Sequence, residues 1–133
     1  MAASFAFELV SPERLLLASN DVTEVSVPGS EGYFTVMANH SPVMTTIKPG
    51  IVTVKREGGA DVKFVVLSGF ADVTPAGCTI LAENATPVGE FDGADLDTKI
   101  TEAKTAATSA TGDEEMASSA AYLDSLISLK AMI

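Results

Sequence analysis

The sequence predicts an all-β N-terminal domain, residues 1–87, followed by a C-terminal α-helical hairpin, residues 88–133. Short runs of β-branched and aromatic residues follow one another closely through the first part, and turn residues separate them. No helical period interrupts these runs, which favours a β-sandwich or a flattened barrel. After Thr86-Pro87-Val88-Gly89 the composition changes abruptly to Ala, Thr, Asp and Glu, and apolar residues recur every three or four positions.

The strands are expected where apolar and polar residues alternate between turn signals. The first run shows the pattern best, because Phe5, Phe7 and Leu9 alternate with Ala6 and Glu8 as in a half-buried strand. Gly, Pro, Ser, Asn and Asp separate the runs that follow. The expected strands cover residues 4–10, 14–18, 22–27, 33–37, 43–47, 51–55, 62–67, 70–73 and 78–82.

The stretch from Val27 to Gly50 organises this domain. Its first turn is Ser30-Glu31-Gly32, where glycine reaches the positive φ that a reversal needs. A polar loop, Asn39-His40-Ser41-Pro42, separates the next two strands. Lys48-Pro49-Gly50 ends the second of them, at a position where proline removes no ladder hydrogen bond.

Two later glycine signals are expected to act differently. Gly58-Gly59 lies between two strand-like runs and predicts a hairpin turn. Ser68-Gly69 interrupts an apolar run and predicts a short break between the strands at 62–67 and 70–73.

Two helices are expected in the C-terminal region. Asp95 is the expected cap of the first, because its side-chain oxygen can accept hydrogen bonds from the first free N–H groups. Thr111-Gly112-Asp113 separates the helices. The expected apolar positions are Leu96, Ile100, Ala103 and Ala107 in the first helix, and Ala120, Leu123, Ile127 and Lys130, widened by Tyr122, Leu126 and Leu129, in the second. Because the seam is rich in alanine, we expect a weakly held appendage.

The composition excludes several function classes. Eighteen acids against eight bases give a formal net charge of −10, which argues against nucleic acid as a partner. No run approaches the roughly 20 apolar residues that span a bilayer, so we expect no direct membrane insertion, and we see no signal peptide. The lone Cys78 cannot form an internal disulfide, which fits a reducing compartment and a buried structural thiol.

We expect no catalytic residue, metal site or cofactor site. His40 is the only histidine and has no nucleophile or carboxylate beside it in any known motif, so a loop residue is the favoured interpretation. Ser30-Glu31-Gly32 is not followed by a helix or by Gly-Lys-Ser/Thr, which excludes a P-loop. Asp92, Asp95 and Asp97 lack the glycine and terminal glutamate of an EF-hand loop, so helix capping is favoured over calcium binding.

The order of these turns carries a family resemblance. Gly29-Ser30-Glu31-Gly32, then a short strand, then Asn39-His40-Ser41-Pro42-Val43, then Ile47-Lys48-Pro49-Gly50, resembles the N-terminal domain of the epsilon subunit of F-type ATP synthases. The two-helix region that follows extends the resemblance over the whole chain.

The resemblance implies a ten-stranded flattened sandwich and a non-catalytic rotor subunit. Such a subunit clamps the gamma subunit above the c-ring and lies peripherally, on the cytoplasmic face of the bacterial inner membrane. Its C-terminal helices can extend toward the alpha/beta catalytic head and inhibit ATP hydrolysis. The residues carried over for the c-ring contact are Ser30, Glu31, Gly32 and Tyr33; those for the gamma contact are His40, Ser41, Pro42 and Met44.

The C-terminal region departs from the family pattern in two ways. Relatives that bind ATP carry Ile or Leu, Asp, two variable residues and then Arg-Ala, whereas here Leu96 and Asp97 are followed by Ile100 and Thr101 at the Arg-Ala positions. We therefore expect weak or absent nucleotide binding. The region is also acidic, where inhibitory helices are often basic, so we expect weak inhibition of hydrolysis.

A second hypothesis is a free-standing β-sandwich ligand-binding module with a helical dimerisation tail. The absence of tryptophan and the presence of only two tyrosines argue against an aromatic-lined pocket. Copurification separates the two hypotheses, because the rotor subunit brings down gamma and c subunits and the binding module brings down a second copy of itself.

Overall fold

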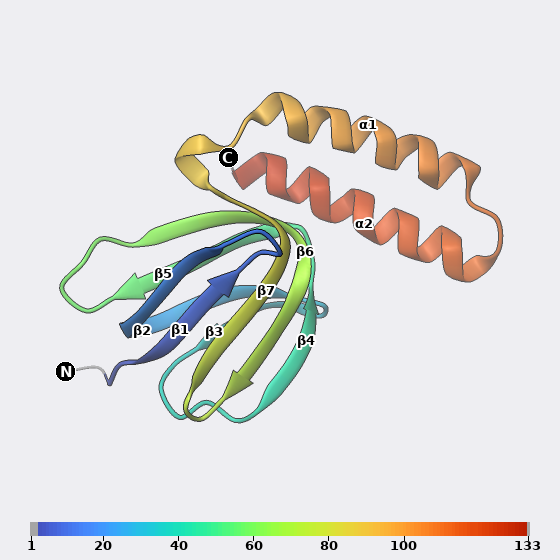
Figure 1. Ribbon diagram of the computed structural model, residues 1–133. Helices are drawn as coiled ribbons and strands as arrows, with labels where there is room; N and C mark the ends of the chain where they lie inside the picture. Colours follow the sequence, from blue (N-terminus) through green and yellow to red (C-terminus); the bar gives the residue numbers. More distant parts are fainter. Residues whose placement is uncertain (1–2, 133) are drawn as a thin grey trace. The chain divides into compact units, whose positions relative to one another are not determined.

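The computed structural model describes residues 3–132, and these divide between Val88 and Gly89 into two compact units. Seven strands form the first unit and a helical hairpin forms the second (Figure 1). The strands are β1 Phe5–Val10, β2 Leu15–Gly29, β3 Gly32–Val36, β4 Val43–Ile47, β5 Gly50–Arg56, β6 Val62–Thr74 and β7 Gly77–Pro87. A 3₁₀ turn, η1 Val88–Glu90, precedes α1 Gly93–Ser109 and α2 Asp113–Met132.

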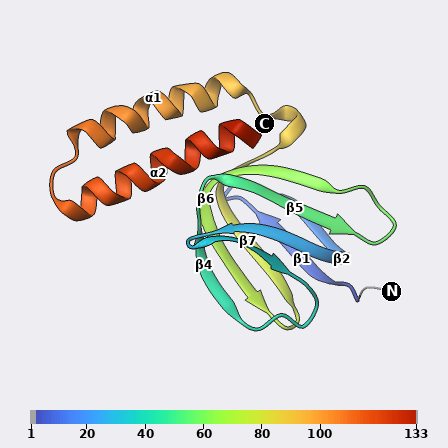
Figure 2. The ribbon, with the colours of Figure 1, turned by 180° about the vertical axis from the view of Figure 1, so that it is seen from behind.

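The strands close on themselves. β1 pairs with β2 on one side and, in parallel, with β7 on the other, while β5 joins β2 to β6 and β6 joins β7. These pairings make a ring of five strands, to which β3 adds along the C-terminal half of β2 and β4 along the C-terminal half of β6 (Figure 2). The predicted all-β sandwich followed by a helical hairpin is therefore confirmed.

The core is built from alternating side chains of these strands. In β1 the phenyl rings of Phe5 and Phe7 and the Leu9 side chain are buried, as the alternation predicts. Val52, Val54 and many other branched side chains join them in one apolar cluster. Removing this apolar surface from water stabilises the sandwich at roughly 25 cal/mol per Å².

The structure has fewer strands than the nine expected from the sequence pattern or the ten that the family resemblance implies, because several predicted strands are continuous. Within residues 3–132 there are seven strands rather than ten, and β2 runs unbroken for 15 residues through Ser19-Asn20-Asp21. The Ser19 hydroxyl donates to the Asp21 carboxylate, so these polar side chains are satisfied without ending the strand. The long strands accommodate such residues through shifts of register and a change of partner: β2 pairs with β1 up to Val22 and with β5 from Val22 onward.

The predicted break at Ser68-Gly69 is also wrong, because β6 continues through it. The ladder with β7 shifts register between Val66 and Gly69, and Gly69 has φ +158°. A Cβ at Gly69 would collide with the carbonyl oxygen of Leu81 and lie 2.9 Å from the Cα of Ala82. The glycine therefore permits a bulge with close strand approach instead of a turn.

The helix cap also differs from the prediction. Asp92, not Asp95, is the N-cap of α1: its side chain accepts a hydrogen bond from the N–H of Ala94 at 2.9 Å. Asp95 lies in the first helical turn, where its negative charge faces the positive end of the helix dipole. The turn between the helices contains Gly112 at φ +85°, as the glycine signal predicts.

Candidate functional site

The first predicted contact group forms the tight turn between β2 and β3. Gly29 and Gly32 pair across this turn, so Ser30 and Glu31 occupy its tip, and Gly32 has φ +127°. The N–H of Ser30 donates to the hydroxyl of Thr45 at 3.2 Å, and the two hydroxyls lie 3.0 Å apart. These contacts hold the turn against β4, a strand that lies further along the chain.

Tyr33, the second residue of β3, has a structural contact as well as exposed surface. Its hydroxyl accepts a hydrogen bond from the N–H of Ile51 at 2.9 Å, and its side chain is 49% exposed. Gly50 makes this approach possible, because a Cβ there would lie 2.5 Å from the Tyr33 hydroxyl and 2.7 Å from the Cβ of Pro28. The Lys48-Pro49-Gly50 stretch therefore follows the end of β4, as predicted, and its glycine also leaves room for the Tyr33 side chain.

The second predicted contact group divides between a loop and a strand. His40, Ser41 and Pro42 lie between β3 and β4, whereas Met44 lies on β4 and is 69% exposed. The Nδ1 atom of His40 is 2.7 Å from the carbonyl oxygen of Ser41, and the N–H of His40 donates to the carbonyl of Met37 at 3.2 Å. His40 is thus a hydrogen-bonded loop residue.

The structure brings part of each group to one surface hollow of about 450 Å³, which we call the β3–β4 hollow. Its lining includes the four residues of the first group together with Met44; His40, Ser41 and Pro42 do not line it. Four residues that the sequence pattern did not indicate complete the lining: Gly29, Phe34, Val43 and Thr45. Alternation within β4 could have indicated that Thr45 projects from the face opposite Met44, but not that it contacts Ser30.

This hollow is suited to recognition. Its polar side chains are the Glu31 carboxylate and the hydroxyls of Ser30, Thr45 and Tyr33, and the first two hydroxyls bond to each other. Its apolar side chains include the exposed Met44. Exposed apolar side chains with a polar rim are typical of protein interfaces. Within residues 3–132 no group of three or more His, Cys, Asp or Glu side chains is arranged to hold a metal ion.

Cys78 is an inert structural thiol by its surroundings. It is buried in the β core beside Asp72, and burial, with a smaller contribution from the negative charge of Asp72, raises the pKa of its thiol to about 12. Because the thiolate is the reactive form, a pKa so far above neutrality leaves the group protonated.

The two residues of the ATP-motif remnant take structural positions in the hairpin. Leu96 is fully buried, and the carboxylate of Asp97 forms an ion pair with Lys130 of α2. Ile100, at the position of the family arginine, is buried as well.

Neither helix among the described residues has the length and apolarity that a bilayer crossing demands.

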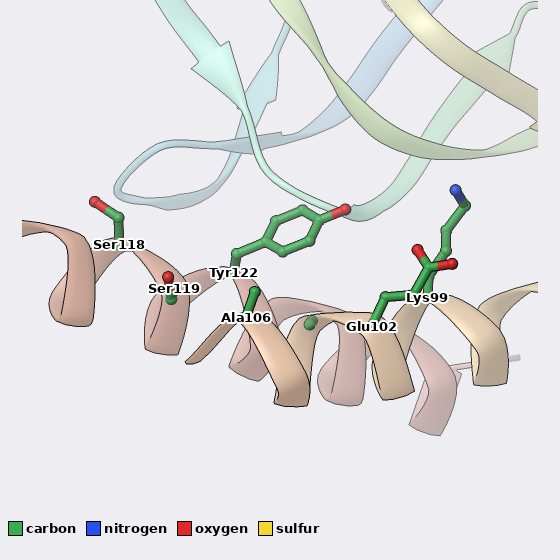
Figure 3. Close-up of a pocket in the computed structure, with 7 residues that line it drawn as sticks. Lys99, Glu102, Ala106, Ser118, Ser119 and Tyr122 are labelled. Carbon is green, nitrogen blue, oxygen red and sulfur yellow. The ribbon is translucent and has the colours of Figure 1, made fainter. Parts of the chain in front are cut away.

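A separate hollow of about 370 Å³ lies along the hairpin (Figure 3). Lys99, Glu102 and Ala106 line it from α1, and Ser118, Ser119 and Tyr122 line it from α2. The side chains of Lys99, Glu102 and Tyr122 point out of the helix pair to the same side (Figure 3). The small side chains of Ala103, Ala106, Ser118 and Ser119 make up much of its lining.

Known proteins resemble the chain in sequence and fold. Residues 4–88 match the family model described as ATP synthase, Delta/Epsilon chain, beta-sandwich domain. The ATP synthase epsilon chain of Mesorhizobium japonicum is 53% identical over 133 residues, covering 100% of this chain and 98% of the relative. That of Brucella anthropi is 51% identical with the same coverage.

Two solved structures share the fold. A chain of the mitochondrial ATP synthase of Euglena gracilis, in an assembly of OSCP, F1 and c-ring, has a TM-score of 0.76 and 25% identity; the match covers 99% of this chain and 82% of that one. A chain from the central stalk and c-ring of the Tetrahymena thermophila mitochondrial enzyme has a TM-score of 0.67 at 12% identity, covering 98% and 96%.

Proposed function

Because the chain belongs to the ATP synthase delta/epsilon family, we propose that it is a non-catalytic subunit of the rotor's central stalk, coupling c-ring rotation to the gamma subunit. The observation that carries this proposal is the full-length match to epsilon chains, since it includes the hairpin as well as the sandwich. The fold suits the task, because a closed ring of strands around one apolar core resists unwinding under torque.

The proposed contact surface is the β3–β4 hollow together with the loop that carries His40, Ser41 and Pro42. Ser30, Glu31, Gly32 and Tyr33 meet the polar loops of the c-ring, and His40, Ser41, Pro42 and Met44 meet gamma. The shared hollow supports this assignment, because it lets both partners be held by one rigid part of the sandwich: the Ser30 turn is hydrogen-bonded to the strand that carries Met44.

The proposed location is peripheral, on the cytoplasmic face of the bacterial inner membrane, where the complex holds the subunit. The C-terminal helices approach the alpha/beta catalytic head in this proposal. Residues from Glu90 onward carry Glu and Asp in excess over Lys99, Lys104 and Lys130, so we propose weak inhibition of ATP hydrolysis by the hairpin.

The proposal is tested by copurification from detergent-solubilised membranes with tagged wild type, Met44→Glu and Leu15→Glu. Leu15 is a matched control, since it is 56% exposed in the same unit but does not line the hollow. A charge buried at the gamma contact costs about 1.4 kcal/mol or more, so we expect at least a roughly tenfold loss of bound gamma for Met44→Glu only.

Two outcomes count against the proposal. If wild type brings down neither gamma nor c subunits and is instead recovered as a dimer, the chain is the alternative binding module. If both variants retain gamma equally well, the contact surface lies elsewhere on the sandwich.

A further inference from the structure

β4 has one open side. Along the other side it pairs with β6 from Val43 to Ile47, whereas the open side has a single bridge, between Ile47 and Gly29 of β2. Figures 1 and 2 both show β4 at the margin of the strands. Within residues 3–132 no strand therefore covers this side of β4 from Val43 to Thr46.

The strand register shows which backbone groups lie on the open side. The turn between β6 and β7 closes at Thr74 and Gly77, so every second residue of β6, counted back from Thr74, bonds to β7 and the others bond to β4. Ala71 is one of the others, and it pairs with Thr45. Because backbone groups alternate sides along a strand, the N–H and C=O of the adjacent Met44 point away from β6.

The groups around Met44 have hydrogen bonds, but its own backbone has none on the open side. The N–H of Lys48 donates to the carbonyl of Pro28 at 2.9 Å, and the Thr45 hydroxyl donates to the carbonyl of Thr46 at 3.0 Å. Among the described residues no partner meets the N–H and C=O of Met44 there. Such groups at a sheet edge are a template for another strand.

This edge lacks the features that usually prevent strand pairing. Proteins protect exposed edges with charged side chains, prolines or bulges. β4 contains no charged residue and no proline, and its ladder with β6 has no shift of register. The β3–β4 hollow lies along the edge at Val43, Met44 and Thr45, so an extended segment has both backbone partners and space.

Charge indicates which kind of segment fits. Among the residues that line the hollow, Glu31 alone is charged, so a segment with Lys or Arg near Glu31 is complementary to it. An apolar side chain of the segment would lie beside Met44, which is 69% exposed. A second copy of this chain is a poor fit, because it brings another Glu31 and a formal charge of −10.

We propose that β4 receives an extended segment of the gamma subunit as an additional strand, paired with the Met44 backbone and carrying Lys or Arg close to Glu31. The inference rests on the proposed function, which assigns Met44 to the gamma contact, and it adds that backbone hydrogen bonds make this contact. Glu31 lies at the tip of its turn and has two carboxylate oxygens, so it can meet this base in addition to the c-ring.

The test is copurification of gamma with the full chain, comparing Met44→Pro with Met44→Ala. Both variants lose the thioether side chain, but only proline removes the N–H and places its ring where the added strand must lie. β6 does not use this N–H, so the two variants should have the same urea midpoint. We expect Met44→Pro to retain at least about tenfold less gamma than Met44→Ala, because a carbonyl of the partner is left without a donor.

Thr35→Pro is the matched control. Gly29 and Gly32 close the turn between β2 and β3, so by the same alternation the N–H of Thr35 points away from β2. Thr35 also lies in an edge strand, but it does not line the hollow. We expect this variant to retain as much gamma as wild type; a loss equal to that of Met44→Pro would show a general effect of proline and would overturn the proposal.

Hydrogen exchange of the wild-type chain tests the proposal without a substitution, and it decides the matter if Met44→Pro does not fold. The Met44 amide should exchange at least about tenfold more slowly with gamma bound than in the free chain. Equal recovery of gamma by the two folded Met44 variants, or unchanged exchange at Met44, overturns strand addition and leaves the proposed function intact. If wild type brings down no gamma, the proposed function and strand addition both fail.

Discussion

Substituting Gly69 tests the physical reason why β6 is one strand. In Gly69→Ala the new Cβ would collide with the Leu81 carbonyl oxygen and approach the Cα of Ala82 to 2.9 Å, and both are backbone atoms of the neighbouring strand β7. The backbone at Gly69, with φ +158°, is also one that a side chain rarely adopts. Strained backbone costs about 1–3 kcal/mol and overpacking about 1–3 kcal/mol, so we expect a loss of at least about 2 kcal/mol.

The matched control is Gly89→Ala. No heavy atom lies within 4 Å of a Cβ placed there, and this glycine is not among those with positive φ. We expect stability within about 0.5 kcal/mol of wild type, or slightly raised, because alanine restricts the unfolded chain.

Urea unfolding followed by the β signal of circular dichroism measures the difference. For a domain of this size the denaturant slope is about 1 kcal/mol per M, so the midpoint of Gly69→Ala should fall by about 2 M relative to the control. If the two variants unfold within about 0.5 M of each other, the bulge tolerates a side chain, and close approach of β7 is not why glycine occupies this position.

Two further predictions concern chemistry. The buried Cys78 thiol should resist alkylation in the folded chain. The free energy of unfolding should fall between pH 9.0 and about 12. The reason is that the thiol loses its proton near pH 9.0 in the unfolded chain, whereas its pKa is about 12 in the folded chain. The fall is about 1.4 kcal/mol per pH unit; Cys78→Ala should lack it, and an identical fall in that variant would contradict the argument. Titration calorimetry of the full chain with magnesium ATP should show no low-micromolar binding, because Asp97 is paired with Lys130 and Ile100 is buried; such binding would show that these contacts yield to nucleotide.

Local pattern predicted the β domain well where strands are short. Phe5, Phe7 and Leu9 alternate as a half-buried strand must, and glycine marks the turn at Gly32, where positive φ is required. The same reasoning failed at Ser68-Gly69 and at Ser19 to Asp21, where turn-forming residues lie inside long strands. A glycine in the sequence is compatible with a turn and with a bulge. Only the position of the neighbouring strand shows which of the two forms.

The hairpin shows a similar division. Spacing predicted two helices and the buried positions of Leu96, Ile100 and Ala103. In the second helix it placed Ile127 on the main apolar side and let Leu126 and Leu129 only widen it, whereas Ile127 is 47% exposed and the two leucines are buried. A helix with few large apolar residues has no sharply defined apolar face, so its rotation is set by the partner helix.

The sequence by itself determined the division into strands and helices, the acidic character and the family resemblance, because turn chemistry and apolar period act over a few residues. The tertiary structure decided which distant residues meet: Ser30 with Thr45 beside Met44, and Asp97 with Lys130. Such meetings depend on strand register and on helix pairing, and both are fixed by burial summed over the whole unit.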